Sequence, residues 1–336
     1  MKVQFAKTLR QYNKENLAKD MVAGLIIMAV SIPISMGYAQ IAGLPAVYGL
    51  YGSVFPILIF ALFSTSPQFI FGVDAAPAAL IGSALLSLGV ESGSAEAMQV
   101  VPVLTFFVAL WLLAFYVMKA GKLVNYISAP VMGGFITGIC TTIILMQIPK
   151  LMGGTAGVGE LPELIEHIAG TVSTINVPSI VLGLIALAIL LIAKRVVPKF
   201  PMAVLLMAAG AVMTKFFPVE QWGVKTLDAV ETGMPRWSVP SFTAVSLKET
   251  VTISLSVAVV IMAETLLAEN NFANKNGYRL DDNQEILAFS MGNFLAAFTG
   301  CCPINGSVSR TAMGEQYQAK TQLTGIVAGL SMIVLL

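Results

Sequence analysis

The stretch "CCPINGSVSRTAMGEQ", residues 301–316, places the charged side chain of Arg310 between two apolar runs. The run before it contains "ILAFSMGNFLAAFTG", and the run after it contains "TGIVAGLSMIVLL". A charged side chain is costly inside a lipid bilayer, and membrane proteins usually retain one there for a function such as an ion pathway. If the chain crosses a membrane, this stretch therefore indicates a functional site at Arg310.

The composition indicates that it does. Of the 336 residues, 57% are hydrophobic and 11% are charged, and the mean hydropathy is +0.83. An ordinary soluble domain has about 25% charged residues, because its surface must be solvated. The sequence therefore predicts an all-α polytopic membrane protein. Its net charge of +1 gives no sign of a nucleic-acid partner.

Apolar runs of about the length of a membrane span recur along the chain. Seven of them cover residues 21–41, 47–63, 98–117, 126–148, 181–193, 200–217 and 250–268. Three shorter or interrupted runs cover residues 75–90, 286–298 and 307–316. A last run begins near Leu323 and is still apolar at Leu336, so the sequence is interpreted as a fragment or a truncated chain.

Basic residues predict the orientation. Before the first run and in alternate later connections the sequence has Lys2, Lys7, Arg10, Lys14, Lys19, Lys119, Lys122, Lys194, Arg195, Lys199, Lys275 and Arg279. The opposite connections have only Lys150, Lys215, Lys225, Arg236 and Lys248. Because positively charged loops remain in the cytoplasm, we expect a cytoplasmic N-terminus in the cell inner (plasma) membrane.

Two stretches resemble each other. "FPILIFALFSTSPQFIFGVDAAPAAL", residues 55–80, and "MGNFLAAFTGCCPINGSVSRTAM", residues 291–313, each have an apolar helix, an irregular segment, and a small-residue start to a second helix. An odd number of predicted spans separates them, so the second copy enters the membrane the other way up. This pattern is typical of inverted-repeat transporters, in which two discontinuous helices meet at the binding site.

The chemistry of helix ends indicates what such a site would bind. The first turn of a helix leaves four N–H groups without partners and carries roughly half a positive charge. Two such ends, at residues 72–76 and 306–310, would attract an anion without a metal or cofactor, and Arg310 would add a full charge. The alternative is that Arg310 pairs with Asp74 or Glu264, or reaches the membrane interface.

The residues also resemble a known family. "DMVAGLIIMAVSIPISMGYAQIAGLPAVYGLYGSVFPILIFALFSTS", residues 20–66, is similar to the signature of the sulfate permease (SulP) anion transporters, to which prestin is related. The resemblance continues through "GVDAAPAAL", "IMAETLLAENNFA" and "NGSVSRTAMGEQYQAKTQLTGIVAGL", and it covers almost the whole chain. The Asp in "GVDAA" resembles bacterial members.

The resemblance implies fourteen membrane segments in two inverted repeats of seven, followed by a STAS domain. By that template residues 1–19 are a cytoplasmic segment, residues 20–246 are the first repeat, and residues 247–336 are segments 8–11 of an incomplete second repeat, without a STAS domain. Segments 1–4 and 8–11 would form a core, and segments 5–7 would belong to a gate. The full-length protein is expected to be a homodimer.

The resemblance also implies a substrate site. Its residues would be Ser31, Ile34, Tyr38, Asp74, Ala75, Ser309 and Arg310. The first three are expected around a helix break at Pro33, and Ile34 departs from the polar residue of prestin-like members. Because a carboxylate is an awkward neighbour for an anion, Asp74 is expected to cap its helix or to pair with Arg310.

Glu264 is a second costly residue, since it interrupts the apolar stretch "SLSVAVVIMAETLL". Burial would favour its protonated form, and the resemblance implies coupling to a proton or to sodium. Arg310 is its expected partner across the core. The alternative is a permanently paired structural carboxylate.

The sequence thus predicts a secondary active transporter of small anions, sulfate-like, bicarbonate or dicarboxylate, working as a proton symporter by alternating access. The alternatives are a nucleobase-type transporter of the same fold, and an anion channel or a non-transporting membrane scaffold. Because no plausible catalytic pair and no Walker-type nucleotide loop can be found, neither an enzyme nor an ATP-driven pump is expected.

Overall fold

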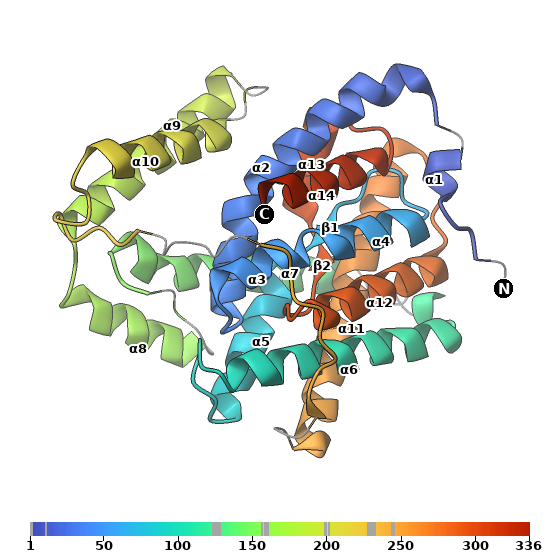
Figure 1. The fold of residues 1–336 in the computed structure, drawn as a ribbon, viewed down its shortest axis with the longest axis horizontal. Coiled ribbons are helices and arrows are strands. Elements are labelled where there is room, and N and C mark those ends of the chain that lie inside the picture. Colours follow the sequence, from blue (N-terminus) through green and yellow to red (C-terminus); the bar gives the residue numbers. More distant parts are fainter. Residues whose placement is uncertain are drawn as a thin grey trace. The chain divides into compact units, whose positions relative to one another are not determined.

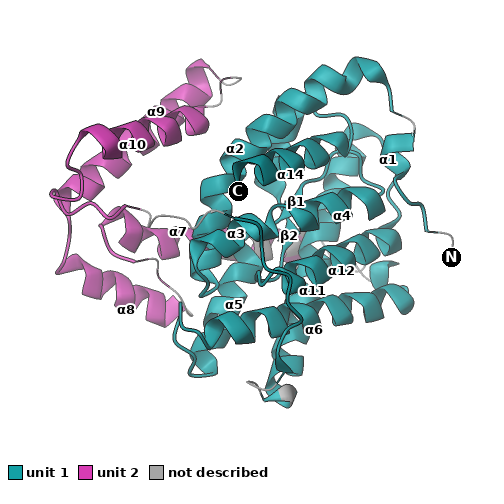
Figure 2. Ribbon diagram, viewed as in Figure 1, with its two compact units in different colours: residues 1–129, 232–336 teal, residues 130–231 magenta. Residues whose placement is uncertain are grey.

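The structure is a computed structural model, and it describes residues 3–10, 12–122, 129–155, 157, 161–197, 200, 202–226, 233–242 and 246–336. The first residues of the expected span at 126–148 lie outside the described residues. The basic residues Lys2 and Lys199 lie outside them as well. The chain forms two compact units, residues 1–129 with 232–336, and residues 130–231 (Figure 2). The first unit gathers the segments that the family resemblance assigns to the core.

The first unit opens with two short helical turns, α1 (Lys7–Arg10) and η1 (Lys14–Asn16), before the long helix α2 (Leu17–Ile41). The expected break at Pro33 is wrong, because α2 continues through this residue. A proline removes one backbone hydrogen bond and crowds the preceding turn, and membrane helices tolerate this where neighbouring groups satisfy the freed carbonyl.

The expected span at residues 47–63 is instead divided into α3 (Ala46–Gly52) and α4 (Phe55–Phe63). Pro56 lies at the start of α4, where its missing N–H costs nothing, whereas in an unbroken helix its ring would clash with the carbonyl of residue 52. Strand β1 (Phe71–Gly72), α5 (Ala75–Ser87) and α6 (Ala97–Val117) follow.

The same unit resumes with α11 (Leu247–Asn276), which ends at Gly277 in the left-handed conformation typical of helix ends (φ 73°). Helix α12 (Asp282–Phe298) follows, and the side chain of Asp281 caps it by accepting from Gln284 N–H. Strand β2 (Asn305–Gly306), α13 (Val308–Gln316) and α14 (Leu323–Leu335) complete the unit.

The two short strands pair with each other, and theirs is the one sheet in the described residues (Figure 1). The pairing is antiparallel, with Phe71 opposite Gly306 and Gly72 opposite Asn305. A side chain at Gly306 would overlap the ring of Phe69 and the methyl group of Thr265, so a glycine is needed here. An antiparallel pair is what two inverted copies of one strand–helix unit would form.

Packing across the sequence holds this pair in place. Rings of Phe60, Phe71 and Phe289 stack, with centroids 4.7 Å apart for Phe60–Phe71 and 5.4 Å apart for Phe71–Phe289. On another side, Ile27 of α2 and Ile57 of α4 pack with Ala328 of α14. Elements from both ends of the chain therefore share one core around the two strands.

The second unit contains α7 (Ala129–Leu151), α8 (Leu161–Val172), α9 (Val177–Val196) and α10 (Met202–Phe216). Helix α9 is longer than its apolar run because Asn176 caps it, its side chain accepting from Ser179 N–H at 2.8 Å. In the part of the chain that the structure describes, five helices are long and apolar enough to cross a membrane. Four of the seven long apolar runs overlap them with similar bounds, and a fifth corresponds to α3 with α4.

Candidate functional site: two helix N-termini joined by a buried arginine

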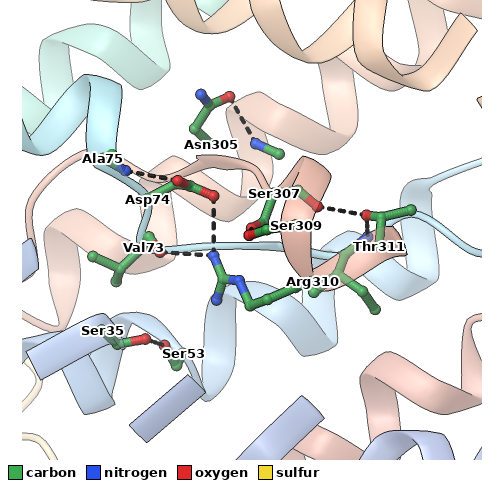
Figure 3. Close-up of polar contacts among 12 residues, drawn as sticks. Ser35, Ser53, Val73, Asp74, Ala75, Asn305, Ser307, Ser309, Arg310 and Thr311 are labelled. Atoms are coloured by element: carbon green, nitrogen blue, oxygen red, sulfur yellow. Dashed lines mark hydrogen bonds and ion pairs between the residues drawn. The ribbon is translucent and has the colours of Figure 1, made fainter. Parts of the chain in front are cut away.

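The antiparallel strand pair brings the N-termini of α5 and α13 together, although they lie far apart in the sequence. Each strand is followed by one or two residues and then by its helix, so both helices begin beside the pair. Figure 3 shows the guanidinium of Arg310, from α13, directed at Val73 and Asp74 before α5. These contacts bring residues 72–76 and 306–310 together, and their role as an anion site stays a prediction.

Arg310 is almost completely buried, with 1% of its surface exposed. Its Nη2 donates to the carbonyl oxygen of Val73 at 2.7 Å and lies 3.5 Å from Asp74 Oδ2. Its Nε is also buried, and it has no hydrogen-bond partner in the structure. The arginine is therefore enclosed by protein, and it retains donor capacity beyond its contacts with the α5 side.

Asp74 caps α5. Its backbone is extended (φ −141°, ψ 169°), and its Oδ1 accepts from Ala75 N–H at 2.7 Å. Both roles expected for it, a helix cap and a partner of Arg310, are confirmed by these contacts. The α5 terminus thus has a carboxylate of its own, and this charge offsets the positive end of the helix.

The start of α13 is different. Ser307 occupies the capping position, but its side chain makes no capping hydrogen bond and lies 3.3 Å from Ser309 Oγ. Ser309 is exposed. Thr311 Oγ1 donates to the Ser307 carbonyl oxygen at 2.6 Å and accepts from Ile70 N–H at 3.0 Å, which fixes this turn against β1. The α13 terminus therefore keeps its positive field without a carboxylate cap.

Glu264, on α11, is half-buried and does not pair with Arg310, so that expectation is wrong. Its Oε2 accepts from Asn305 Nδ2 at 2.7 Å. Asn305 Oδ1 in turn accepts from Gly306 N–H at 2.7 Å and from the hydroxyl of Thr265. Glu264 is therefore linked through β2 to the start of α13, while the arginine reaches across to α5.

Asn305 and Thr265 were missed by the sequence analysis. Asn305 precedes a glycine in an apolar region, and a polar side chain at membrane depth is a signal of an internal partner. Thr265 follows Glu264 directly, but its hydroxyl could have bonded within its own helix. Only the strand pairing identifies both as partners of the same segment.

Ser31, Ile34 and Tyr38 share one face of α2, since they lie three and four residues apart. Ser31 is buried, and the other two are half-buried. The next turn is fixed by α3, because Gly49 packs so closely on the Ser35 carbonyl that any side chain there would overlap it. The part that these three residues play in a substrate site stays a prediction.

Two short helices that start from a paired strand, inside a bundle of long apolar helices, form an arrangement typical of polytopic membrane transporters with discontinuous helices. The sequence profile of the sulfate permease family matches residues 17–336. The chain therefore belongs to this family, as its signature residues predict. Family membership also places it among transport proteins and not among enzymes.

A curated relative, sulfate transporter 2.1 of Arabidopsis thaliana, is 30% identical over 97% of this chain and 50% of its own length. Among solved structures, the murine SLC26A9 anion transporter in the inward-facing state is 23% identical, with a TM-score of 0.84 over 98% of this chain and 58% of that chain. The transmembrane domain of BicA, a cyanobacterial bicarbonate transporter, is 19% identical, with a TM-score of 0.81 over 96% of this chain and 83% of that chain.

These likenesses confirm the all-α polytopic fold. The chain spans about half the length of the curated relatives that it matches. Together with the five apolar helices, family membership makes it a multi-pass membrane protein.

Proposed function

We propose that this chain is the membrane part of a secondary active transporter of small anions that works by alternating access. The observation that carries the proposal is the open N-terminus of α13, held beside a second helix end with a buried arginine between them. Backbone N–H groups and a fixed positive charge attract an anion without a metal, and they select by size and hydration. The names of the relatives support a sulfate-like or bicarbonate substrate, and a dicarboxylate is kept as a third candidate.

The anion would lie on the α13 side, where the hydroxyl of Ser309 is exposed and the buried Nε of Arg310 has no partner. Asp74 would hold the arginine in position, and Ala75 would contribute the helix end that it begins. Ser31, Ile34 and Tyr38 of α2 would complete the wall. In this arrangement Asp74 is a positioning residue and not a ligand of the anion.

The first test is a competition panel. The purified protein in lipid nanodiscs is titrated with radiolabelled sulfate, and bicarbonate, chloride and a dicarboxylate are added as competitors. Saturable binding that at least one of these anions displaces supports the proposal. A protein that binds none of them contradicts it.

Glu264 is proposed as the coupling group. A carboxylate here accepts one amide hydrogen bond and faces no cation in the ion pairs of the described residues, so protonation would remove its desolvation cost. If it binds a proton as the anion arrives, the loaded core moves with one charge fewer, and uptake follows the proton gradient. The hydrogen bond to Asn305 would transmit this protonation to β2 and the start of α13.

The test compares the full-length wild-type protein with its Glu264→Gln variant in proteoliposomes. The glutamine mimics the neutral form, so accumulation driven by an inward proton gradient is lost, while exchange at equal anion concentrations on both sides continues. Accumulation that persists in the variant contradicts the assignment. Accumulation that follows a sodium gradient in wild type would show a cation site near Glu264 and would also contradict it.

We also propose that residues 1–19 are a cytoplasmic segment, that residues 20–246 form one inverted repeat, and that residues 247–336 begin the second. The assembled protein would be a homodimer in the plasma membrane. Cysteine labelling from one side of intact cells tests the orientation. Labelling of Lys14→Cys from outside the cell would contradict a cytoplasmic N-terminus.

One observation favours a second candidate, a nucleobase-type transporter. The Glu264 carboxylate and the Asn305 amide form an acceptor and donor pair of the kind that binds the edge of a neutral base. Arg310 favours the anion, because a neutral base gains little from a buried positive charge. Displacement of bound sulfate by uracil, with no effect of bicarbonate or dicarboxylates, would favour this candidate.

A further inference from the structure

A second pair of acidic side chains lies away from the helix ends. Glu269 of α11 and Glu285 of α12 are both completely buried. Helices α11 and α12 pack on each other, and the charge of each of these two carboxyl groups acts on the other. Neither takes part in the two ion pairs of the described residues, Lys275–Glu315 and Arg310–Asp74. Two buried carboxylates so close together would repel each other unless a proton or a cation lay between them.

Glu285 is supplied with donors. Its Oε1 accepts from the backbone N–H and the hydroxyl of Thr65, and its Oε2 accepts from Ser64 Oγ at 2.8 Å. The hydroxyl oxygen of Thr65 also accepts from Asp281 N–H, so its own hydrogen is directed at Glu285. An ionised carboxylate accepts at several positions and donates nothing, and this set of partners fits the ionised form of Glu285.

Glu269 has no such supply. Both of its carboxyl oxygens are buried, and neither has a hydrogen-bond donor in the structure. As a carboxylate it would be an unpaired buried charge beside a second negative group, which is among the costliest arrangements in a protein interior. With a proton it becomes neutral, and its O–H can donate to Glu285. We propose that Glu269 and Glu285 form a binding site for one proton, which sits on Glu269 and is shared by hydrogen bond with the Glu285 carboxylate.

Among the described residues, no ion pair involves either glutamate, and the basic residues near the start of α12, Arg279, Lys119 and Lys122, are exposed. The nearest other acid, Asp282 of α12, accepts from Asn270 Nδ2 at 2.9 Å. Tyr278, in the connection between α11 and α12, contacts Ser66 Oγ, and burial raises the pKa of Tyr278 to about 12, so it stays neutral. Lys275 is engaged by Glu315. Helices α4, α5 and α6, which pack on α11 or α12, contain no Asp, Glu, Lys, Arg or His.

The shared proton would stabilise the contact between three segments of the first unit. Glu269 belongs to the helix that carries Glu264, Glu285 lies in the first turn of α12, and Ser64 and Thr65 belong to the segment that leads into β1. The pair is separate from Glu264, whose carboxylate bonds to Asn305. Loss of the proton would place two negative charges together, and their repulsion would push α11 away from α12 and from the segment that contains Ser64 and Thr65. The site is thus a proton-dependent contact between these segments, away from the anion site, and it is independent of which anion is carried.

Infrared spectroscopy tests where the proton is. The protein in nanodiscs of phosphatidylcholine and phosphatidylglycerol is compared as the single variant Glu264→Gln and as the double variant Glu264→Gln/Glu269→Gln, so that Glu264 itself contributes nothing. At neutral pH the single variant should show the C=O stretch of a protonated carboxylic acid, and the double variant should lose it. A single variant without the band, or a double variant that keeps it, overturns the proposal.

Thermal unfolding provides a second readout. If the folded protein keeps the proton on Glu269 while an unfolded glutamate, with a pKa of about 4.3, loses it, the wild type should lose stability steadily as the pH rises above about 4.3. Glu269→Gln needs no proton, so it should melt at a higher temperature than wild type at neutral pH, and its melting temperature should change less as the pH rises. Glu285→Gln should melt several degrees lower, because an amide cannot accept all three donors.

The tests of this proton site can be distinguished from the tests of anion binding. A Glu269→Gln protein that fails to fold, or that loses as much stability as Glu285→Gln, would mean that the charged form is required and would overturn the proton site. Anion affinity should be the same in Glu269→Gln and wild type. Failure of anion binding in both proteins would contradict the proposed function and leave the infrared result to decide the proton site on its own.

Discussion

The N-termini of α5 and α13 are brought together by one antiparallel strand pair, yet they differ chemically. The first is closed by Asp74, whose carboxylate accepts from the first N–H group of its own helix. The second has a serine without a capping bond, an exposed Ser309, and Arg310. The N-terminus of α5 is therefore called the anchoring end, and the N-terminus of α13 the open end.

The difference indicates a division of work. The anchoring end receives Arg310 through the Val73 carbonyl and, at the longer distance of 3.5 Å, through Asp74. These contacts hold a buried charge that would otherwise be costly, and they leave the Nε of Arg310 without a partner. The open end would then attract the anion. If this comparison is correct, changes at α13 weaken binding and a change at Asp74 does not.

The largest effect is expected from Arg310→Gln. It removes the only full positive charge at the two helix ends, and a hydrogen bond to a charged group contributes about 1.5–3 kcal/mol. Sulfate affinity, measured by titration in nanodiscs, should fall about tenfold to a hundredfold. The matched control is Lys320→Gln, because Lys320 is an exposed basic residue just before α14. Equal losses in the two variants would mean that the field at the helix ends is not what binds the anion.

A smaller change of opposite sign is expected from Asp74→Asn. Asparagine is also a good helix cap, so the start of α5 is preserved while a negative charge near the anion is removed. Sulfate should bind about threefold to fivefold more tightly, as expected for about 1 kcal/mol of relieved repulsion. Isothermal titration at constant ionic strength provides the measurement. Weaker binding would show that the charge of Asp74 is needed to orient Arg310, and it would reverse the roles of the two ends.

The smallest effect is expected from Ser309→Ala. Because the hydroxyl of Ser309 is exposed, it should contribute about 0.5 kcal/mol, the lower end for a neutral hydrogen bond, so sulfate affinity should fall about twofold to threefold. The control is Ser53→Ala, since Ser53 bonds to Ser35 at 2.6 Å between α2 and α3 and takes no part in either helix end. An unchanged affinity in Ser309→Ala would place the anion away from the open end.

Much of this arrangement could be predicted from the sequence. Apolar length alone located α6 and α11, and the similarity of residues 55–80 and 291–313 predicted that two short helices meet. The cap by Asp74 could also be predicted, because an aspartate directly before a run of alanines has one favourable local role. Each of these features depends on neighbours in the sequence or on a repeated pattern.

The features that could not be predicted depend on which helices touch. Glu264 was expected to pair with Arg310, because both are charged residues in apolar stretches of the sequence. The register of the strand pair brings Asn305 to Glu264 instead. Likewise, the pairing of Glu269 with Glu285 requires the contact between α11 and α12. The continuity of α2 through Pro33 depends on tertiary packing that overrides the local preference of proline.

The central claim is that the anion binds at the open end of α13. The most direct measurement is the backbone amide chemical shift of selectively ¹⁵N-labelled protein in lipid, titrated with whichever of sulfate and bicarbonate binds more tightly. The account predicts large, saturable shifts at Ser309 and Arg310, with the same midpoint as binding, and small shifts at Ala75. Larger shifts at Ala75, with Ser309 and Arg310 unchanged, would contradict it.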